Sequence, residues 1–260
     1  MQPIEKKIPN LLTLGNLFCG FVAVLACLGG DLVMAGWLVF LAALFDVLDG
    51  LAAKLLKATS AIGAELDSLA DLVSFGVVPS LIAYMLLIKS HATWLDIAYI
   101  SDIQVFALLP FLLTAAGAYR LARYNTNQGI RDQESVGDNF QGLPIPASAM
   151  FFASLPLMLQ YDVFVVRFDI FYVSQLVLNP YFLSGCILMF SWLMVSHLPL
   201  FSLKVSSFKG PNRNLIILFL VLSLLLFAFL LWAAIPIILI LYIVFSYFTK
   251  KSFNEIQSAD

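Results

Sequence analysis

The chain has 260 residues, of which 62% are hydrophobic and only 12% are charged, and its formal net charge is -2. An ordinary soluble domain carries about 25% charged residues, so this deficit, with a mean hydropathy of +0.96, excludes a water-soluble globular fold and disorder. The near-neutral charge gives no indication of nucleic-acid binding. At about 20 apolar residues per crossing, a chain of this length accommodates up to eight transmembrane helices.

Apolar runs bounded by charged and turn residues predict an all-α integral membrane protein. The last long run is divided between Trp232 and Pro236, because a proline ends or kinks a helix. We expect no β-strands, since the runs do not alternate in polarity and open sheet edges are not tolerated in lipid. The eight expected spans are approximately 10–29, 34–57, 62–88, 104–124, 142–160, 181–202, 214–231 and 235–249.

The distribution of Lys and Arg predicts the orientation. If the N-terminus is inside, only Lys89 and Arg167 of the fourteen cations fall on the outer side. Cytoplasmic loops of membrane proteins carry such an excess, so we expect both termini in the cytoplasm and an even number of spans. The expected inner cations are Lys6, Lys7, Lys54, Lys57, Arg120, Arg123, Arg131, Lys204, Lys209, Arg213, Lys250 and Lys251.

Four aspartates fall inside the second and third spans, where ionisable groups are costly and therefore indicate function. Asp46 and Asp49 are three residues apart, so they share one helix face. Asp67 and Asp71 are four apart and do the same. If the two spans form a hairpin with its tip near Ala58, both pairs lie at similar depth, roughly 14 to 19 Å from the tip. We therefore expect the four carboxylates to converge.

Four like charges in a dry site must be protonated or neutralised. One or two hard divalent cations, Mg2+ or Mn2+, suit such oxygen ligands. Two ions held in this way can clamp a phosphate or diphosphate and stabilise a displacement at phosphorus. The alternative is a structural cluster paired with Lys54 and Lys57, although two lysines do not neutralise four acids.

Small residues accompany the carboxylates. Gly50, Ala52 and Ala53 keep the second span thin, and Gly63 does the same at the start of the third. Close helix packing is the alternative reason for small residues in membranes. Together with the acids they predict a pocket that a flat ligand can enter, and Ser60 is expected to cap the third span.

Polar residues at the inner ends of two other spans are further candidates. Arg120 and Arg123 share a face of the fourth span and either bind an anion, with Asn125 assisting, or flank the membrane with snorkelling side chains. Asn10 and Thr13 either reach the same pocket or cap the first span.

Residues 46 to 71 read DVLDGLAAKLLKATSAIGAELDSLAD. This segment resembles the signature of the CDP-alcohol phosphotransferases, D-x2-D-G-x2-A-R-x8-G-x3-D-x3-D. Lys54 stands where the family has arginine, which keeps a positive charge for a phosphate but loses the bidentate fork. The matching positions are Asp46, Asp49, Gly50, Ala53, Gly63, Asp67 and Asp71.

Three further segments resemble the bacterial membrane-integral phosphatidylserine synthases within that family. They are IPNLLTLGNLFCGF (8–21), RLARYN (120–125) and FQGLPIPASA (140–149), whose prolines Pro144 and Pro146 are expected to begin the fifth span. The resemblance implies a six-helix catalytic domain at 1–205. Two additional helices and a short cytoplasmic tail then occupy 206–260.

What the resemblance implies is a transfer from CDP-diacylglycerol to L-serine, giving phosphatidylserine and CMP at the inner (cytoplasmic) membrane, with the active site facing the cytoplasm. A homodimer is also compatible with the resemblance. The implied ligands of two Mg2+ or Mn2+ ions are Asp46, Asp49, Asp67 and Asp71, with Asp71 also the general base. The implied CDP-diacylglycerol contacts are Asp49, Gly50, Ala53, Lys54, Gly63 and Asp67; the serine or phosphate contacts are Arg120, Arg123 and Asn125.

Two other functions and one other route to the same product compete with this one. The same family with another acceptor, such as glycerol 3-phosphate or inositol phosphate, stays open. A divalent-cation carrier would leave the small residues between the acids without a role. A phosphohistidine route to phosphatidylserine is excluded, because neither His91 nor His197 is followed by Lys two positions on.

Overall fold

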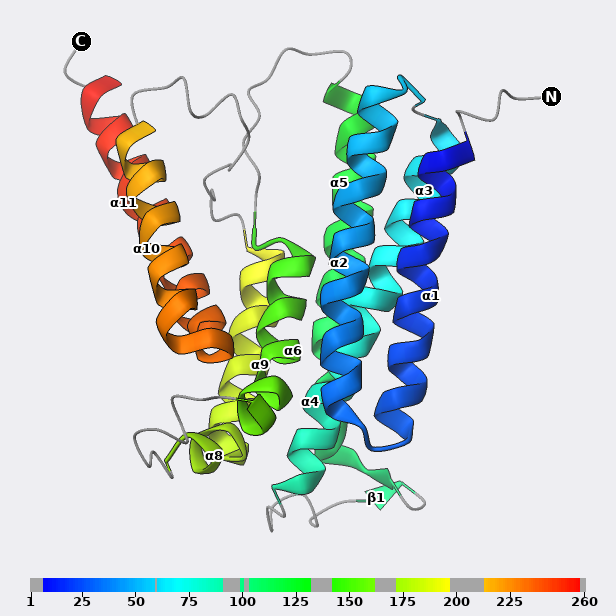
Figure 1. The fold of residues 1–260 in the computed structure, drawn as a ribbon, viewed down its shortest axis with the longest axis vertical. Coiled ribbons are helices and arrows are strands. Elements are labelled where there is room, and N and C mark those ends of the chain that lie inside the picture. Colours follow the sequence, from blue (N-terminus) through cyan, green and yellow to red (C-terminus); the bar gives the residue numbers. More distant parts are fainter. Residues whose placement is uncertain are drawn as a thin grey trace.

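The computed structural model describes residues 7–58, 60–90, 99–100, 103–131, 142–161, 172–196 and 213–257, and helices dominate them (Figure 1). The α-helices are α1 (Ile8–Leu28), α2 (Leu32–Leu55), α3 (Ala61–Asp71), α4 (Val78–Lys89), α5 (Phe111–Arg131), α6 (Ile145–Tyr161), α8 (Tyr172–Val177), α9 (Pro180–Val195), α10 (Arg213–Leu230) and α11 (Ala234–Gln257). The helical elements also include a π-helical segment, η2 (Leu72–Val77), and two 3-10 segments, η4 (Val105–Leu108) and η6 (Leu231–Ala233).

By length and composition the chain is a multi-pass membrane protein. Five helical stretches are long and apolar enough to cross a membrane: Ile8–Leu28, Leu32–Leu55, Ala61–Lys89, Val105–Thr126 and Ile217–Ser246. Two shorter apolar helices, Ile145–Gln160 and Pro180–Val195, follow the same pattern. Adding these two and dividing the last long stretch at η6 would give eight crossings, a number that stays a prediction.

The first three helices begin where local chemistry favours them. α1 has Pro9 in its first turn, where a missing N–H costs nothing. Asp31 caps α2 by accepting a hydrogen bond from the backbone N–H of Met34 at 2.9 Å. Ser60 caps α3 in the same way, accepting from the N–H of Gly63 at 3.0 Å, so the predicted cap is confirmed. In the folded chain, α1 packs against both α2 and α3.

The third span is not a regular α-helix. Directly after Asp71, the backbone changes to the π-helical segment η2 and then to α4. The hydroxyl of Ser74, within η2, donates to the backbone carbonyl of Asn16 on α1 at 3.0 Å. Gly20 makes this approach possible, because a Cβ there would collide with the Ser74 side chain. π-helical turns interrupt α-helices mostly at functional sites.

The second part of the bundle is built around α6 and α9, with the aromatic rings of Phe151, Phe152 and Phe190 in mutual contact. α6 begins at Ile145, directly after Pro144, as predicted. Gly142 precedes it with φ of 78°, and a Cβ there would lie 2.6 Å from the Met194 carbonyl oxygen. Glycine is therefore required where the chain enters α6 beside the end of α9.

The C-terminal helices α10 and α11 form a hairpin at the edge of the molecule (Figure 1). The predicted break between the last two spans is confirmed: α10 ends at Leu230, Leu231 has φ of 47°, and α11 begins at Ala234. Trp232 in the turn packs edge-on against Trp37 of α2, with ring centroids 4.9 Å apart. This ring is one of the contacts that join the hairpin to the rest of the bundle.

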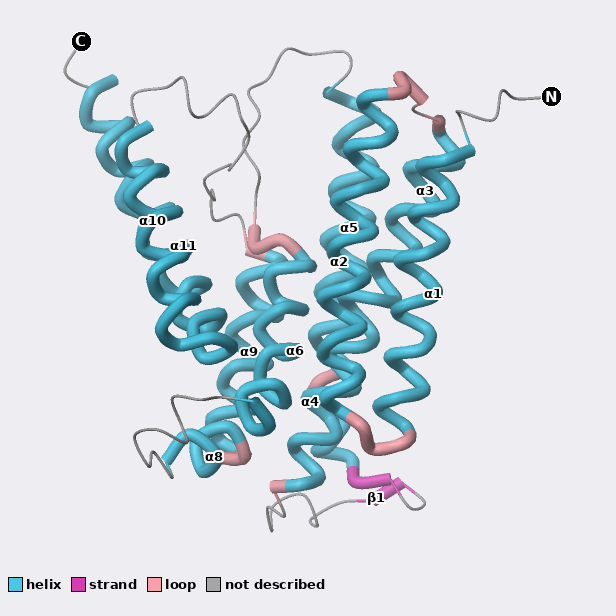
Figure 2. Tube along the Cα trace, viewed as in Figure 1, coloured by secondary structure: helices cyan, strands magenta, loops and turns pink. Residues whose placement is uncertain are grey.

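Two short strands contradict the expectation of an entirely strand-free chain. β1 (Tyr99–Ile100) and β2 (Ile103–Gln104) pair antiparallel, with Tyr99 opposite Gln104 (Figure 2). They lie between the stretches Ala61–Lys89 and Val105–Thr126, where the rule against open edges in lipid does not apply. The prediction was wrong because it extended that rule to a connection outside the spans.

The helix ends divide into two groups (Figure 1). The start of α1, the α2–α3 turn and the ends of α5 and α11 lie at one end of the molecule, with Lys7, Lys54 and Lys57. Lys89 ends α4 at the opposite end. This separation agrees with the predicted charge distribution, while the cytoplasmic assignment stays a prediction. Outside the described residues lie Lys6, Arg167, Lys204, Lys209, His91, His197, the stretch 197–202 of the sixth expected span, and the expected boundary at 205–206.

Candidate active site

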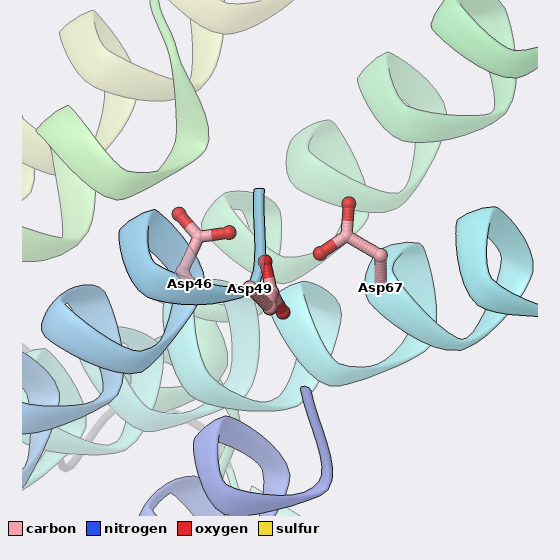
Figure 3. A group of neighbouring side chains, drawn as sticks. All are labelled: Asp46, Asp49 and Asp67. Carbon is pink, nitrogen blue, oxygen red and sulfur yellow. The ribbon is translucent and has the colours of Figure 1, made fainter. Parts of the chain in front are cut away.

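The tight turn between α2 and α3 brings three carboxylates together. Lys57 enters it with φ of 49°, and α3 then runs back in the opposite direction to α2, each helix packed against α1. Asp46, Asp49 and Asp67 each offer a carboxylate oxygen within 4.8 Å of the others. Figure 3 shows Asp46 and Asp49 on α2 and Asp67 on α3, with the carboxylates of Asp46 and Asp67 on the same side of the helices. The predicted convergence is confirmed for these three residues.

The fourth carboxylate lies beside this group rather than within it. Asp71 is one helical turn beyond Asp67, at the junction of α3 and η2. It is within electrostatic reach of the other three aspartates, and Asn16 of α1 donates a hydrogen bond from Nδ2 to Asp71 Oδ1 at 3.1 Å. Asp71 is thus held separately from the three clustered carboxylates.

α1 supplies polar groups to the site. Thr13, only 3% exposed, donates a hydrogen bond from Oγ1 to Asp49 Oδ2 at 2.6 Å. Asn10 lines the cavity beside these residues. Of the two predictions for Asn10 and Thr13, pocket contact is confirmed and helix capping is wrong, because Lys7 occupies the N-cap position and both residues lie inside the helix.

A cavity of about 170 Å³ opens between α1, α2 and α3. Gly50 faces open space, since a Cβ built there would meet no atom within 4 Å. Gly63 is in a tighter place: its Cβ would lie 3.0 Å from Asn10 Oδ1 and from Ser60 Oγ, so any larger residue here would require these side chains to shift. The lining residues are Pro9, Asn10, Thr13, Asp49, Gly50, Ala53, Ala58, Ser60, Gly63, Ala64 and Asp67.

The donor set fits a hard divalent cation. All three clustered ligands are carboxylates, and Asp67 Oδ1 is buried without a hydrogen-bond partner among the described residues. Lys54 and Lys57 are exposed, and neither forms an ion pair with these acids in the described part of the chain. The lysine-paired alternative is therefore not seen in the structure. Oxygen-only acidic sites suit Mg2+, Mn2+ or Ca2+ rather than softer metals.

The predicted CDP-diacylglycerol contacts divide into two groups. Asp49, Gly50, Ala53 and Asp67 line the cavity together with Gly63. Lys54, on the last turn of α2, is exposed and is absent from the cavity lining. Its contact with a phosphate stays a prediction.

Arg120 differs from an ordinary membrane-flanking arginine. It is 9% exposed, and its Nε has no hydrogen-bond partner among the described residues. Asp71 and Tyr242 of α11 both lie within electrostatic reach of its guanidinium. A buried arginine beside an acidic group is a candidate for binding an anionic ligand.

The other two predicted acceptor contacts are already engaged within the protein. Arg123 donates from Nη1 to the backbone carbonyl of Val195 at 3.0 Å, at the C-terminal end of α9 where carbonyls lack helical partners. Asn125 donates from Nδ2 to Ser68 Oγ at 3.0 Å and so joins α5 to α3. Both residues therefore help to assemble the helices around the site.

Asn16 is the main residue that the sequence interpretation missed. The available signal was a polar amide inside an otherwise apolar span, a position that in membranes indicates a specific partner. That its partner is Asp71 depends on how α1 packs against α3, which spacing alone does not show.

Comparison with known proteins identifies the family. The CDP-alcohol phosphatidyltransferase family matches residues 6–196. A CDP-diacylglycerol–serine O-phosphatidyltransferase of Helicobacter pylori is 37% identical over 142 residues, 55% of this chain and 54% of that protein. The Bacillus subtilis protein of the same name is 34% identical over 143 residues, 55% of this chain and 71% of that protein.

An archaetidylserine synthase of Methanothermobacter thermautotrophicus is 33% identical over 174 residues, 66% of this chain and 67% of that protein. The chain thus spans about half the length of the Helicobacter pylori relative and about two thirds of the archaeal one. The family match includes all four aspartates and the cavity between α1, α2 and α3. The chain therefore belongs to the CDP-alcohol phosphatidyltransferase family.

Proposed function

We propose that this protein transfers the phosphatidyl group of CDP-diacylglycerol to L-serine, forming phosphatidylserine and releasing CMP. The observation that carries the proposal is the convergence of Asp46, Asp49 and Asp67 within 4.8 Å of one another. Asp49 and Asp67 also line the cavity between α1, α2 and α3. The names of the relatives from Helicobacter pylori and Bacillus subtilis support serine as the acceptor.

In this proposal the four aspartates hold two divalent ions, Mg2+ or Mn2+. Asp46, Asp49 and Asp67 are close enough to share an ion, and Asp71 adds a fourth carboxylate one turn away. When bound, the ions supply positive charge that stabilises the diphosphate oxygens and the leaving CMP.

The nucleotide part of CDP-diacylglycerol occupies the cavity. Gly50 and Ala53 leave its α2 wall thin, and Gly63 lets α3 close the other side. Lys54, at the exposed end of α2, offers a point charge to a phosphate oxygen. The acyl chains extend into the bilayer beside the apolar helices.

Asp71 acts as the general base. It takes the proton of the serine hydroxyl, which is a weak nucleophile without a positioned base. The serine oxygen forms a bond to the phosphorus that carries diacylglycerol, and the bond from that phosphorus to the bridging oxygen breaks. The bridging oxygen leaves with CMP, so one phosphate ester forms as one anhydride is cleaved.

Arg120 binds the carboxylate of serine. Among Arg120, Arg123 and Asn125, it alone is buried with an unpartnered donor in the described residues. Its position near Asp71 brings the carboxylate of the acceptor close to the base that receives the hydroxyl proton. Arg123 and Asn125 support the surrounding helices through their contacts with Val195 and Ser68.

The proposed topology has eight crossings of the inner membrane, with both termini and the active site at the cytoplasmic face. The end of the molecule that holds the α2–α3 turn also holds Lys7, Lys54 and Lys57, which supports this orientation. The proposed catalytic domain is 1–205, and 206–260 forms the additional hairpin and tail. A homodimer enters no step of this reaction.

The test is CMP release from CDP-diacylglycerol by purified protein with a panel of acceptors. L-serine should give a rate at least about tenfold above glycerol 3-phosphate or inositol 1-phosphate, a difference of about 1.4 kcal/mol in transition-state binding. An equal or higher rate with glycerol 3-phosphate would contradict serine as the acceptor. Failure to retain radiolabelled CDP-diacylglycerol would instead favour a cation carrier.

A further inference from the structure

Asn16 is a fully buried polar residue of α1 with two contacts to the third span. Its side-chain Nδ2 donates to Asp71 Oδ1 at 3.1 Å, and its backbone carbonyl accepts from Ser74 Oγ at 3.0 Å. Its relative exposure is 0%. The backbone contact joins Asn16 to η2, and the side-chain contact reaches the proposed base.

The orientation of the Asn16 amide follows from Asp71. An ionised carboxylate only accepts hydrogen bonds, so the NH2 group must face it. The carbonyl oxygen Oδ1 then points elsewhere, and it has no partner among the described residues. A buried acceptor without a hydrogen bond lowers the stability of the fold by about 1–3 kcal/mol. The presence of asparagine at this position therefore needs an explanation other than stability. A leucine of similar size would avoid the cost.

Asp71 needs an external contact to fix its carboxylate. Asp46, Asp49 and Asp67 repel it, and Arg120 attracts it. Such charge interactions depend less on orientation than a hydrogen bond does. Within the described part of the chain, the hydrogen bond from Asn16 is the direct contact that distinguishes one Asp71 oxygen from the other.

We propose that Asn16 is the positioning residue for Asp71: it holds Oδ1 and so presents Oδ2 to the hydroxyl of the acceptor. The inference rests on the proposed function, in which Asp71 receives that proton. The π-helical turn that follows Asp71 packs against α1 beside this hydrogen bond. A misoriented base slows proton transfer more than it weakens the binding of either substrate.

The test compares Asn16→Leu with Ser74→Ala in the full-length protein, using CMP release with CDP-diacylglycerol and L-serine. Asn16→Leu removes the donor at nearly constant volume, and kcat should fall about 10- to 100-fold while both KM values change less than about threefold. Its thermal unfolding temperature should stay close to that of the wild type, because removal of the unpaired Oδ1 offsets the loss of the hydrogen bond to Asp71. Ser74→Ala breaks the neighbouring bond but leaves the amide, so kcat should stay within about threefold.

A purely structural role predicts different results. If Asn16→Leu lowers the unfolding temperature and raises both KM values, or if it turns over like the wild type, the inference is overturned. An equal loss of kcat in Ser74→Ala also overturns it. Should the leucine prevent folding, Asn16→Ala is measured in the same way, with the same fall in kcat expected and the same outcomes decisive.

Asp71→Asn separates this inference from the proposed function. If Asp71→Asn keeps full turnover, the base assignment fails. If Asp71→Asn is slow while Asn16→Leu is fast, only the inference about Asn16 fails. The double variant should be no slower than Asp71→Asn alone, since Asn16 acts through Asp71. Two independent losses that add in the double variant would also contradict the positioning role.

Discussion

The two helical hairpins α2–α3 and α10–α11 have similar turns but different roles in the molecule. Each turns at a non-glycine residue with positive φ, Lys57 in the first and Leu231 in the second. The most apolar parts of Leu32–Leu55, which is α2, and of Ala61–Lys89, which begins with α3, are 39% and 56% buried inside the molecule, whereas that of Ile217–Ser246 is only 6% buried. The first hairpin encloses a polar site, and the second presents apolar side chains outward.

This difference shows which sequence features report function in a membrane protein. The α10–α11 stretch is the more apolar of the two, so hydropathy alone ranks it as the better membrane segment. The α2–α3 hairpin is marked by its departures from apolarity, with carboxylates at helical spacing and small residues between them. In membrane-spanning segments, the polar and ionisable residues, which are costly to bury in lipid, indicate where the functional site lies.

The second hairpin is nevertheless attached to the site. It lies beyond the family match, which ends at residue 196. Trp232 packs against Trp37 and Phe40 of α2, with ring centroids 4.9 and 5.4 Å apart. Tyr242 lies within electrostatic reach of Arg120. The comparison therefore predicts that changes in α2–α3 abolish chemistry, while changes in α10–α11 act on stability.

Removal of divalent ions should have the largest effect. Dialysis against EDTA is expected to abolish CMP release, because four carboxylates without cations cannot bind a diphosphate. Added Mg2+ or Mn2+ should restore it. Full activity in EDTA-treated, metal-free protein would show that the carboxylate cluster needs no ion.

Asp67→Ala should lower kcat/KM by at least about 1000-fold, or about 4 kcal/mol. Asp67 is the α3 member of the carboxylate cluster, and its Oδ1 lacks a partner among the described residues, so nothing replaces it. The matched control is Asp31→Ala, which removes the α2 cap at the opposite end of the helix. That variant should lose about 1 kcal/mol of stability with turnover retained.

Arg120→Ala should raise the KM for serine about tenfold or more, while the KM for CDP-diacylglycerol changes little. The buried guanidinium near Asp71 is expected to bind the serine carboxylate alone. Arg123→Ala is the comparison, since Arg123 bonds to Val195 and should affect both substrates weakly. The measurement is initial-rate kinetics with each substrate varied. A larger serine effect in Arg123→Ala would reverse the assignment.

Helix geometry explains why so much of the acidic cluster was predictable. Asp49 and Asp67 each lie nine residues from Ala58, so a tight turn there places them at equal depth. Ser60 was predictable as a cap because its hydrogen bond to Gly63 spans only three residues. These features depend on local rise, periodicity and one turn.

Contacts between distant segments were not predictable in the same way. Asn16 and Asp71 are 55 residues apart, and their hydrogen bond depends on the π-helical turn and on how α1 packs against it. Arg123 and Val195 are 72 residues apart, so the sequence showed a cation on a helix face but not its partner. The spacing of residues in the sequence shows which side chains share a helix face, whereas tertiary packing determines which residues that face contacts.

Trp232→Ala tests the second hairpin. The ring contacts Trp37, Phe40 and Phe227, so its loss should lower the unfolding free energy by about 1–3 kcal/mol. Turnover per folded molecule should stay within about threefold, measured after thermal-shift and detergent-extraction controls. A loss of turnover comparable to Asp67→Ala, in protein that remains folded, would make the hairpin part of the catalytic site and remove the contrast with α2–α3.

The smallest expected effect belongs to Lys54, where the sequence departs from the family motif. Its ammonium lies at the exposed end of α2, outside the cavity lining, so a phosphate contact there is screened by water. Lys54→Ala should therefore raise the KM for CDP-diacylglycerol only about two- to fivefold, and Lys54→Arg should match or improve on the wild type. Lys57→Ala, on the neighbouring turn, is the matched control for a general loss of positive charge. If Lys54→Ala and Lys57→Ala have equal effects at low and high salt, Lys54 is a membrane-flanking cation, and the α2–α3 hairpin binds nucleotide through its carboxylates and small residues without it.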